Sequence, residues 1–224
     1  LKKGNLVIIQ MNTNPIILNF KDTLLHQSDI DLLMGPHWLN DNIITFYFEY
    51  LEKAAYLDEK DLLFISPEVV QCLKATKGTE LTIFLDPLAA KQKKFVFLAL
   101  NNCEIMDKAG GSHWSLLVYS KPEETFYHFD SLKGTNYSQA GKLSGKLLRY
   151  LSSDGTGDFI EYECLQQTNS YDCGIYLLCN VDFIINYCLK DNKVNGCGII
   201  SEQCAKKKRS DILRIIKNLQ SKGY

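Results

Sequence analysis

The sequence predicts an α+β fold, in which a mainly antiparallel central sheet is flanked by helices. The middle of the chain holds an uninterrupted β-rich run, Phe95–Leu100, of the kind found in strands buried on both faces. Two further β-rich segments follow it, joined by a link of hairpin length. Segments with helical spacing of apolar residues lie before and after this strand region, so the helices are expected to surround the sheet.

The composition is that of a chain with a substantial core. Of its 224 residues, 46% are hydrophobic and 23% are charged, and the formal net charge is −1. This balance provides no basic field for a nucleic acid, and no run approaches the about 18 apolar residues of a membrane span. We predict a single domain over residues 14–224 and a disordered or non-native extension over residues 1–13, because Met11 is a candidate translation start.

Three helical segments are predicted before the strands. Trp38–Tyr56 carries a stripe of apolar residues at helical spacing, and Asn40 or Asp41 is suited to cap it. The segment 66–76 begins with Ser-Pro-Glu, which places a capping serine before a proline in the first turn. Leu81–Leu85 is predicted as a further short turn of helix.

Two strands after the central run are predicted to form an antiparallel hairpin. They are His113–Tyr119 and Thr125–Asp130, and the link between them contains a proline and charged residues. In such a hairpin the start of the first strand lies beside the end of the second. His113 and Asp130 are therefore expected to be neighbours at one edge of the sheet.

The last part of the chain is predicted to add one strand and three helices. The strand is Phe159–Cys164, and the helices are Gln139–Leu151, Cys173–Leu189 and Gln203–Gln220. The last helix contains the basic cluster Lys206–Arg209. We expect this cluster to be a solvated helix face, with a nuclear address as the alternative.

The eight cysteines show no spacing typical of a metal site. There is no Cys-x-x-Cys pair and no close pair of histidines, so neither a metal nor a cofactor is predicted. The apolar stretch near the N-terminus is too short for a signal peptide, so we expect a cytoplasmic or nuclear protein with reduced thiols, not a secreted one. Cys72, Cys179 and Cys188 lie in apolar stretches and are expected in the core.

One cysteine, Cys173, stands apart from the others. It ends the polar, turn-forming loop Gln167–Asp172 and directly precedes an apolar run of helical length. The free N–H groups and aligned peptide dipoles of a helix N-terminus favour an anion, and a thiolate is an anion. Cys173 is therefore a candidate nucleophile.

A cysteine nucleophile needs a base, an orienting group and donors for an oxyanion. His113 is the candidate base and Asp130 its orienting carboxylate. The backbone N–H of Cys173 and the side chain of Gln167 are the candidate oxyanion donors. Each residue alone has a commoner structural role, so the prediction depends on their combination. His128 lies in mid-strand and is expected to be packed or partly exposed.

The segments around these residues resemble the catalytic blocks of the Ulp/sentrin-specific cysteine proteases. The similar segments are Gly110–Tyr119, Phe126–Ser131 and Gln166–Gly174, and Trp38–Asp41 is similar to that family's N-terminal motif. The order His, Asp, Gln, Cys along the chain also matches the family, whereas papain-type enzymes have the order Cys, His, Asn. The resemblance covers about residues 14–220, and Thr168 is a departure within the third block.

The resemblance implies a papain-like cysteine protease fold of the Ulp type, acting without a cofactor. It also implies cleavage after the C-terminal Gly-Gly of a ubiquitin-like modifier. Trp38 and Trp114 would form a narrow slot through which only glycine passes, and Asp41 would contact the modifier. The alternative roles are core packing for the tryptophans and helix capping for Asp41.

The form of the blocks 110–114 and 169–174 resembles the deneddylating members of this family. Their partner is the neddylation modifier, in its precursor and in conjugates such as cullins. A SUMO-specific protease of the same mechanism is one alternative. An acetyltransferase of related His-acid-Cys fold is another, and it should need a basic phosphate-binding patch. A non-catalytic binding module is disfavoured, because all four catalytic positions hold competent residues. We further expect a monomer that binds neither nucleic acid nor membrane, and a loop 107–111 that gates the site.

Overall fold

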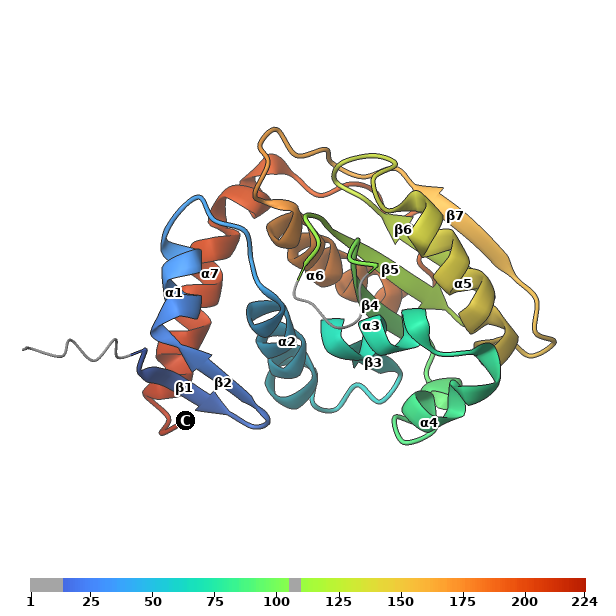
Figure 1. Ribbon diagram of the computed structural model, residues 1–224, viewed down its shortest axis with the longest axis horizontal. Helices are drawn as coiled ribbons and strands as arrows, with labels where there is room; N and C mark the ends of the chain where they lie inside the picture. The colour runs from blue at the N-terminus through green and yellow to red at the C-terminus, as the bar shows by residue number, and fades with distance from the viewer. Residues whose placement is uncertain (1–13, 105–109) are drawn as a thin grey trace, which may run out of the picture.

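The computed structural model describes residues 14–104 and 110–224 (Figure 1). The predicted extension 1–13 and most of the loop expected to gate the site lie outside these residues. A five-stranded sheet in the order β3-β4-β5-β6-β7 forms the centre, with helices on both faces. Its strands are β3 (Leu62–Ile65), β4 (Phe95–Asn101), β5 (Trp114–Ser120), β6 (Thr125–Phe129) and β7 (Asp158–Tyr162).

The sheet is mixed rather than mainly antiparallel. The pairs β4–β5 and β5–β6 are antiparallel, which confirms the predicted hairpin. The outer pairs β3–β4 and β6–β7 are parallel. Their connections contain helices, namely α3 (Pro67–Ala75) and α4 (Thr82–Leu85) for the first and α5 (Tyr137–Leu151) for the second. A crossover through a helix returns the chain in the same direction, and this produces the parallel edges.

Strand β4 supplies both faces of the core, as its continuous apolar run predicts. Phe95, Phe97 and Ala99 pack in the cluster that includes α6 (Cys173–Asp191). The alternate residues Val96, Leu98 and Leu100 pack on the other face, in the cluster formed with α3 and α5. Helix α6 is long and apolar enough to cross a membrane, but 67% of that stretch is buried inside the fold. This marks α6 as a core helix.

An N-terminal unit that the sequence did not predict packs against the end of the chain. Two short strands, β1 (Ile16–Phe20) and β2 (Thr23–His26), form an antiparallel hairpin that leads into α1 (Gln27–Met34). Helix α1 lies beside the last helix, α7 (Glu202–Gln220), as Figure 1 shows. The segment that follows α1 is thereby held next to the C-terminal helix.

Helix α2 (Asp41–Tyr50) begins at the predicted place. The side chain of Asn40 accepts a hydrogen bond from the backbone N–H of Ile43 at 3.0 Å. This makes Asn40 the cap and leaves Asp41 as the first helical residue. The helix continues as a π-helical turn over Leu51–Ala55.

The prediction of a solvated basic cluster is wrong for two of its four residues. Lys206 and Lys207 are exposed, but Lys208 is only 4% exposed and donates hydrogen bonds to Asp182 at 2.6 Å and to the Tyr47 hydroxyl at 2.7 Å. The physical reason is helical spacing, because Lys208 lies on the inner face of α7. That face also carries the buried apolar residues Ile212, Ile216 and Leu219. Arg209, half-buried, is also engaged in contacts away from α7.

Candidate active site

The predicted meeting of His113 and Asp130 is confirmed. His113 directly precedes β5 and Asp130 directly follows β6, so the antiparallel hairpin brings them together at one end of the sheet. His113 Nε2 lies 2.5 Å from Asp130 Oδ1. Both residues are buried, with 3% and 2% of their surface exposed. The remaining ring nitrogen of His113 is left to face another group.

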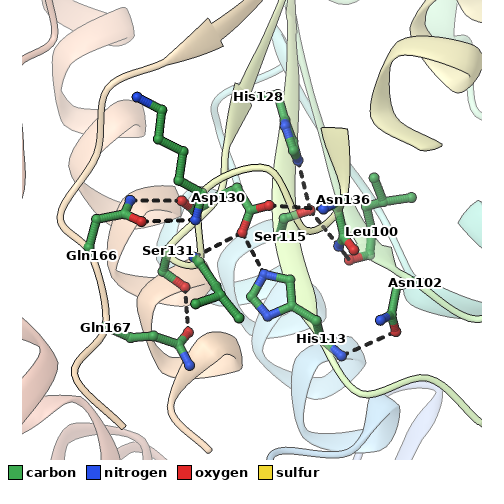
Figure 2. A network of polar contacts seen from close by, with 12 residues as sticks. Leu100, Asn102, His113, Ser115, His128, Asp130, Ser131, Asn136, Gln166 and Gln167 are labelled. Carbon is green, nitrogen blue, oxygen red and sulfur yellow. Dashed lines mark hydrogen bonds and ion pairs between the residues drawn. The ribbon is translucent and has the colours of Figure 1, made fainter. Parts of the chain in front are cut away.

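The carboxylate of Asp130 is fixed on both oxygens. Oδ1 also accepts the backbone N–H of Leu132, and Oδ2 accepts that of Asn136, both at 3.0 Å. Figure 2 shows these contacts converging on Asp130. Burial alone would raise the pKa of Asp130, but the hydrogen bonds from His113, Asn136 and Leu132 outweigh it and lower the pKa. Asp130 is thus a fixed anion that orients the imidazole.

Cys173 is the first residue of α6 and lies next to His113, as predicted. Burial opposes a charge on the imidazole. Hydrogen bonds with Asp130 and with the Cys173 thiol outweigh burial and raise the pKa of His113 to about 9. An imidazole that stays protonated at neutral pH places a positive charge beside the Cys173 sulfur. The sulfur, the imidazole and the carboxylate therefore form one connected group.

The backbone around His113 is held by Asn102, a residue that the sequence analysis missed. Asn102 Oδ1 accepts the N–H groups of Ser112 at 2.7 Å and His113 at 3.2 Å. Nearby, Gly111 has φ +89, and a Cβ there would lie 1.8 Å from the side-chain oxygen of Asn101. Only glycine fits this position. No signal in the sequence separated Asn102 from any other polar loop residue.

A groove of about 520 Å³ leads to Cys173 and His113. Cys173 is only 1% exposed but lines this groove, so a substrate reaches it only through the groove. Three residues singled out by resemblance, Trp38, Asp41 and Trp114, line it too. The structure therefore brings the predicted nucleophile, base and slot residues to one place.

The two tryptophans are held differently. Trp114 is 8% exposed, and its Nε1 donates to the Leu39 carbonyl at 2.9 Å. Trp38 is 46% exposed, and its Nε1 donates to the Ser170 carbonyl at 2.5 Å. Each indole is thus fixed by its polar edge, with aromatic surface left for the groove. Core packing, the alternative role, fits Trp114 in part and does not fit Trp38.

Gln167, the candidate oxyanion donor, is engaged elsewhere in this structure. Its Oε1 accepts the Ser131 hydroxyl at 2.7 Å, and its Nε2 donates to the Asn169 carbonyl at 2.6 Å. In Figure 2 the side chains of Gln166 and Gln167 both point toward the turn at Asp130–Ser131. Gln167 therefore lies on the predicted loop, with its donor directed into the loop itself.

His128 is buried, and both of its ring nitrogens are engaged. Its Nδ1 lies 2.5 Å from the Glu161 carboxylate, and its Nε2 lies 2.9 Å from the Ser115 hydroxyl. The Ser115 hydroxyl oxygen also accepts a hydrogen bond from the Asn136 side-chain amide at 2.8 Å. One potential metal-ligand atom from each of His128, Asp130 and Glu161 lies within 4.8 Å of the other two, a spacing that a metal ion would fit. Each already has a hydrogen-bond partner, however, which favours a structural network behind Asp130.

The other cysteines differ from Cys173 in their surroundings. Burial raises the pKa of Cys179 and of Cys188 to about 12, as expected for core thiols. Cys72 is only half-buried and lines the groove, so its assignment to the core is wrong. The reason is that Cys72 lies on α3 near the groove, away from the apolar stripe formed by Val70 and Leu73.

A cysteine peptidase uses a cysteine thiol that is hydrogen-bonded to an imidazole, which a carboxylate in turn orients. A family model described as the Ulp1 protease family, C-terminal catalytic domain, matches residues 37–220. The chain belongs to the Ulp1 protease family. It is 39% identical over 213 residues to Sentrin-specific protease 8 of Rattus norvegicus, covering 94% of this chain and 98% of that protein.

Two further comparisons support the assignment to this family. The chain is 36% identical over 176 residues to NEDD8-specific protease 1 of Arabidopsis thaliana, covering 76% of each. Among solved structures, the Ulp1 protease domain in complex with Smt3, the yeast ortholog of SUMO, superposes with a TM-score of 0.72 at 22% identity, covering 94% of this chain and 90% of that one. This last similarity concerns the fold, and it confirms the predicted Ulp-type architecture.

Proposed function

We propose that this chain is a deneddylase, a cysteine protease that cleaves after the C-terminal Gly-Gly of the neddylation modifier in precursors and conjugates. The observation that carries the proposal is the meeting of Cys173, His113 and Asp130 at the end of a groove walled by two tryptophans. The choice of modifier is supported by relatives named Sentrin-specific protease 8 and NEDD8-specific protease, at 39% and 36% identity.

The reaction proceeds through a thioester. The Cys173 thiolate attacks the carbonyl carbon of the modifier's last glycine, and a C–S bond forms. His113, held by Asp130, donates its proton to the leaving amine as the C–N bond breaks. His113 then takes a proton from water, and the resulting hydroxide forms a C–O bond at the thioester carbon. The C–S bond breaks, which releases the modifier with a free carboxyl group and restores the Cys173 thiolate beside protonated His113.

The oxyanion formed in each step needs hydrogen-bond donors. The backbone N–H of Cys173, in the first turn of α6, has no acceptor within the helix and points along the helix dipole. Gln167 is the second donor in this proposal. Its Nε2 would have to leave the Asn169 carbonyl when substrate enters. Catalytic hydrogen bonds often tighten only in the complex with substrate.

The groove suits a tail without side chains. Trp38 and Trp114 present aromatic surface on the way to Cys173, and a glycine passes between flat walls that would exclude a larger residue. Asp41, exposed at the start of α2, lines the same groove and offers a carboxylate to the modifier. Asn40 provides the helix cap, while Asp41 Oδ1 accepts the backbone N–H of the next residue, Asn42, at 3.1 Å.

The alternatives receive less support. A SUMO protease is supported by the fold similarity and by a weaker sequence similarity, since ubiquitin-like-specific protease 1 of Saccharomyces cerevisiae is 25% identical over 173 residues. An acetyltransferase should show basic residues for the phosphates of coenzyme A. Among the described residues that line the groove there is no lysine or arginine, and Asp41 and Glu68 are acidic.

Modifiers carrying an electrophile at their C-terminus test both the nucleophile and the modifier. We expect the neddylation modifier to label the wild type and Cys72→Ser, which removes one of the two half-buried thiols that line the groove (Cys72 and Cys103), but not Cys173→Ala. Cys173→Ala should also lose cleavage and keep modifier binding. Labelling of Cys173→Ala would overturn the nucleophile assignment, and faster labelling of the wild type by SUMO would overturn the choice of modifier.

A further inference from the structure

Arg209 on α7 bonds to two segments that are far from it in the sequence, residues 32–37 and Asp172. Its Nη1 donates to the Leu32 carbonyl at 2.7 Å, and its Nη2 donates to the His37 carbonyl at 2.6 Å. Nη2 and Nε also donate to Asp172 Oδ1, at 2.7 and 3.3 Å. The side chains of Arg209 and Asp172 are 18% and 20% exposed, so this ion pair is largely shielded from water.

Both segments adjoin parts of the active site that must meet. Asp172 directly precedes the nucleophile Cys173 and stands at the N-cap position of α6. His37 directly precedes Trp38, the exposed wall of the groove. Trp38 itself donates to the Ser170 carbonyl, on the loop that leads to Cys173. Arg209 and the Trp38 indole therefore both connect the segment 37–38 to the loop 170–172, Arg209 through His37 and Asp172 and Trp38 through Ser170.

Anchoring of α7 does not account for these contacts. The helix is already held by Lys208, which bonds to Asp182 and Tyr47, and by the buried side chains of Ile212 and Ile216. Other charged residues of α7 form exposed pairs within their own helix, such as Arg214 with Asp211. The acceptors named above all lie outside α7, on Leu32 in the last turn of α1 and on His37 and Asp172, which directly precede the groove residues Trp38 and Cys173.

We propose that Arg209 is a positioning residue that sets the distance between the Trp38 wall and the Cys173 loop, and with it the fit of the diglycine tail. The proposal rests on the proposed function for the identity of that tail. A planar guanidinium reaches these acceptors at fixed angles, whereas a lysine ammonium is a single point charge. Lysine at this position keeps the charge beside Asp172 and loses the simultaneous hold on His37 and Leu32.

The proposal is tested by measuring KM and kcat of Arg209→Lys and Arg209→Met, with a fusion to the C-terminus of the neddylation modifier as substrate. We expect KM to rise about 10- to 100-fold with a smaller change in kcat, since misplacement by about 1 Å has effects of this size. Alkylation of Cys173 by iodoacetamide, which needs no slot, should stay within a few-fold of wild type. Arg214→Met, an exposed residue of the same helix, is the control and should match the wild type.

Tryptophan fluorescence supplies a readout that does not depend on cleavage. The chain has two tryptophans, and Trp114 is buried, so acrylamide reports mainly on Trp38. Quenching should increase in Arg209→Lys and stay unchanged in Arg214→Met. If the wild type cleaves no modifier, the proposed function fails, while this measurement still decides the role of Arg209. Unchanged KM and quenching in Arg209→Lys, or equal loss of alkylation and cleavage, would overturn the proposal.

Discussion

The two halves of the active site are built in different ways. The half formed by His113 and Asp130 lies within one hairpin, and the backbone amides that fix Asp130 come from the turn that follows it. The half formed by Cys173 is assembled from distant parts of the chain. The indole of Trp38 closes on the Cys173 loop, and Arg209 supports both from α7.

This difference separates chemistry from recognition. The hairpin half controls the proton of the base, and its geometry follows from strand pairing and from the turn after Asp130. The assembled half sets the width of the groove, and its geometry depends on how α1, α2 and α7 dock. Changes in the first half are therefore expected to lower kcat, and changes in the second half, apart from the nucleophile Cys173 itself, to raise KM.

Asp130→Asn should produce the largest effect. An asparagine amide facing His113 Nε2 favours the wrong tautomer of the imidazole, and the corresponding change in a serine protease lowers kcat about 10⁴-fold. We expect a fall in kcat of this order with little change in KM, measured on a modifier fusion.

Asp172→Asn is the matching change in the other half. It keeps the hydrogen bond from Asn169, so kcat/KM should fall by no more than about 100-fold, mainly through a higher KM. Equal losses in kcat would remove the distinction between the two halves.

Lys208→Met should have the next largest effect, and on stability rather than on chemistry. The ammonium of Lys208 bonds to Asp182 and to Tyr47 and lies 4.1 Å from the centre of the Tyr47 ring. Losing a hydrogen bond to a charged group costs about 1.5–3 kcal/mol, and the lower end applies because Asp182 is partly exposed. Urea unfolding measures this. The exposed neighbour Lys207→Met should change the free energy of unfolding by less than about 0.5 kcal/mol.

The comparison also explains what the sequence predicted and what it did not. His113, Asp130 and Cys173 were predictable, because strand pairing and a helix start are local rules that fix where side chains go. The parallel edge strand β3 was missed because four apolar residues between two helical segments carry no period. Lys208 and Arg209 were assigned to solvent because of their charge, although Lys208 lies at helical spacing from the buried apolar residues Ile212, Ile216 and Leu219. Contacts that span most of the chain leave no local pattern.

The smallest expected effect is a pH dependence of the free energy of unfolding. We expect it to arise in the hairpin half, from His113. The pKa of His113 is raised to about 9, above its ordinary value of about 6.5. A raised pKa stabilises the folded state fully below the unfolded value, and this contribution is lost as pH rises through the folded value. The free energy of unfolding should therefore fall between about pH 6.5 and 9 more steeply in the wild type than in His113→Gln. Arg209→Lys leaves the His113–Asp130 pair intact and should keep the wild-type slope. A His113→Gln slope equal to that of the wild type would show that His113 holds no extra proton in the folded state.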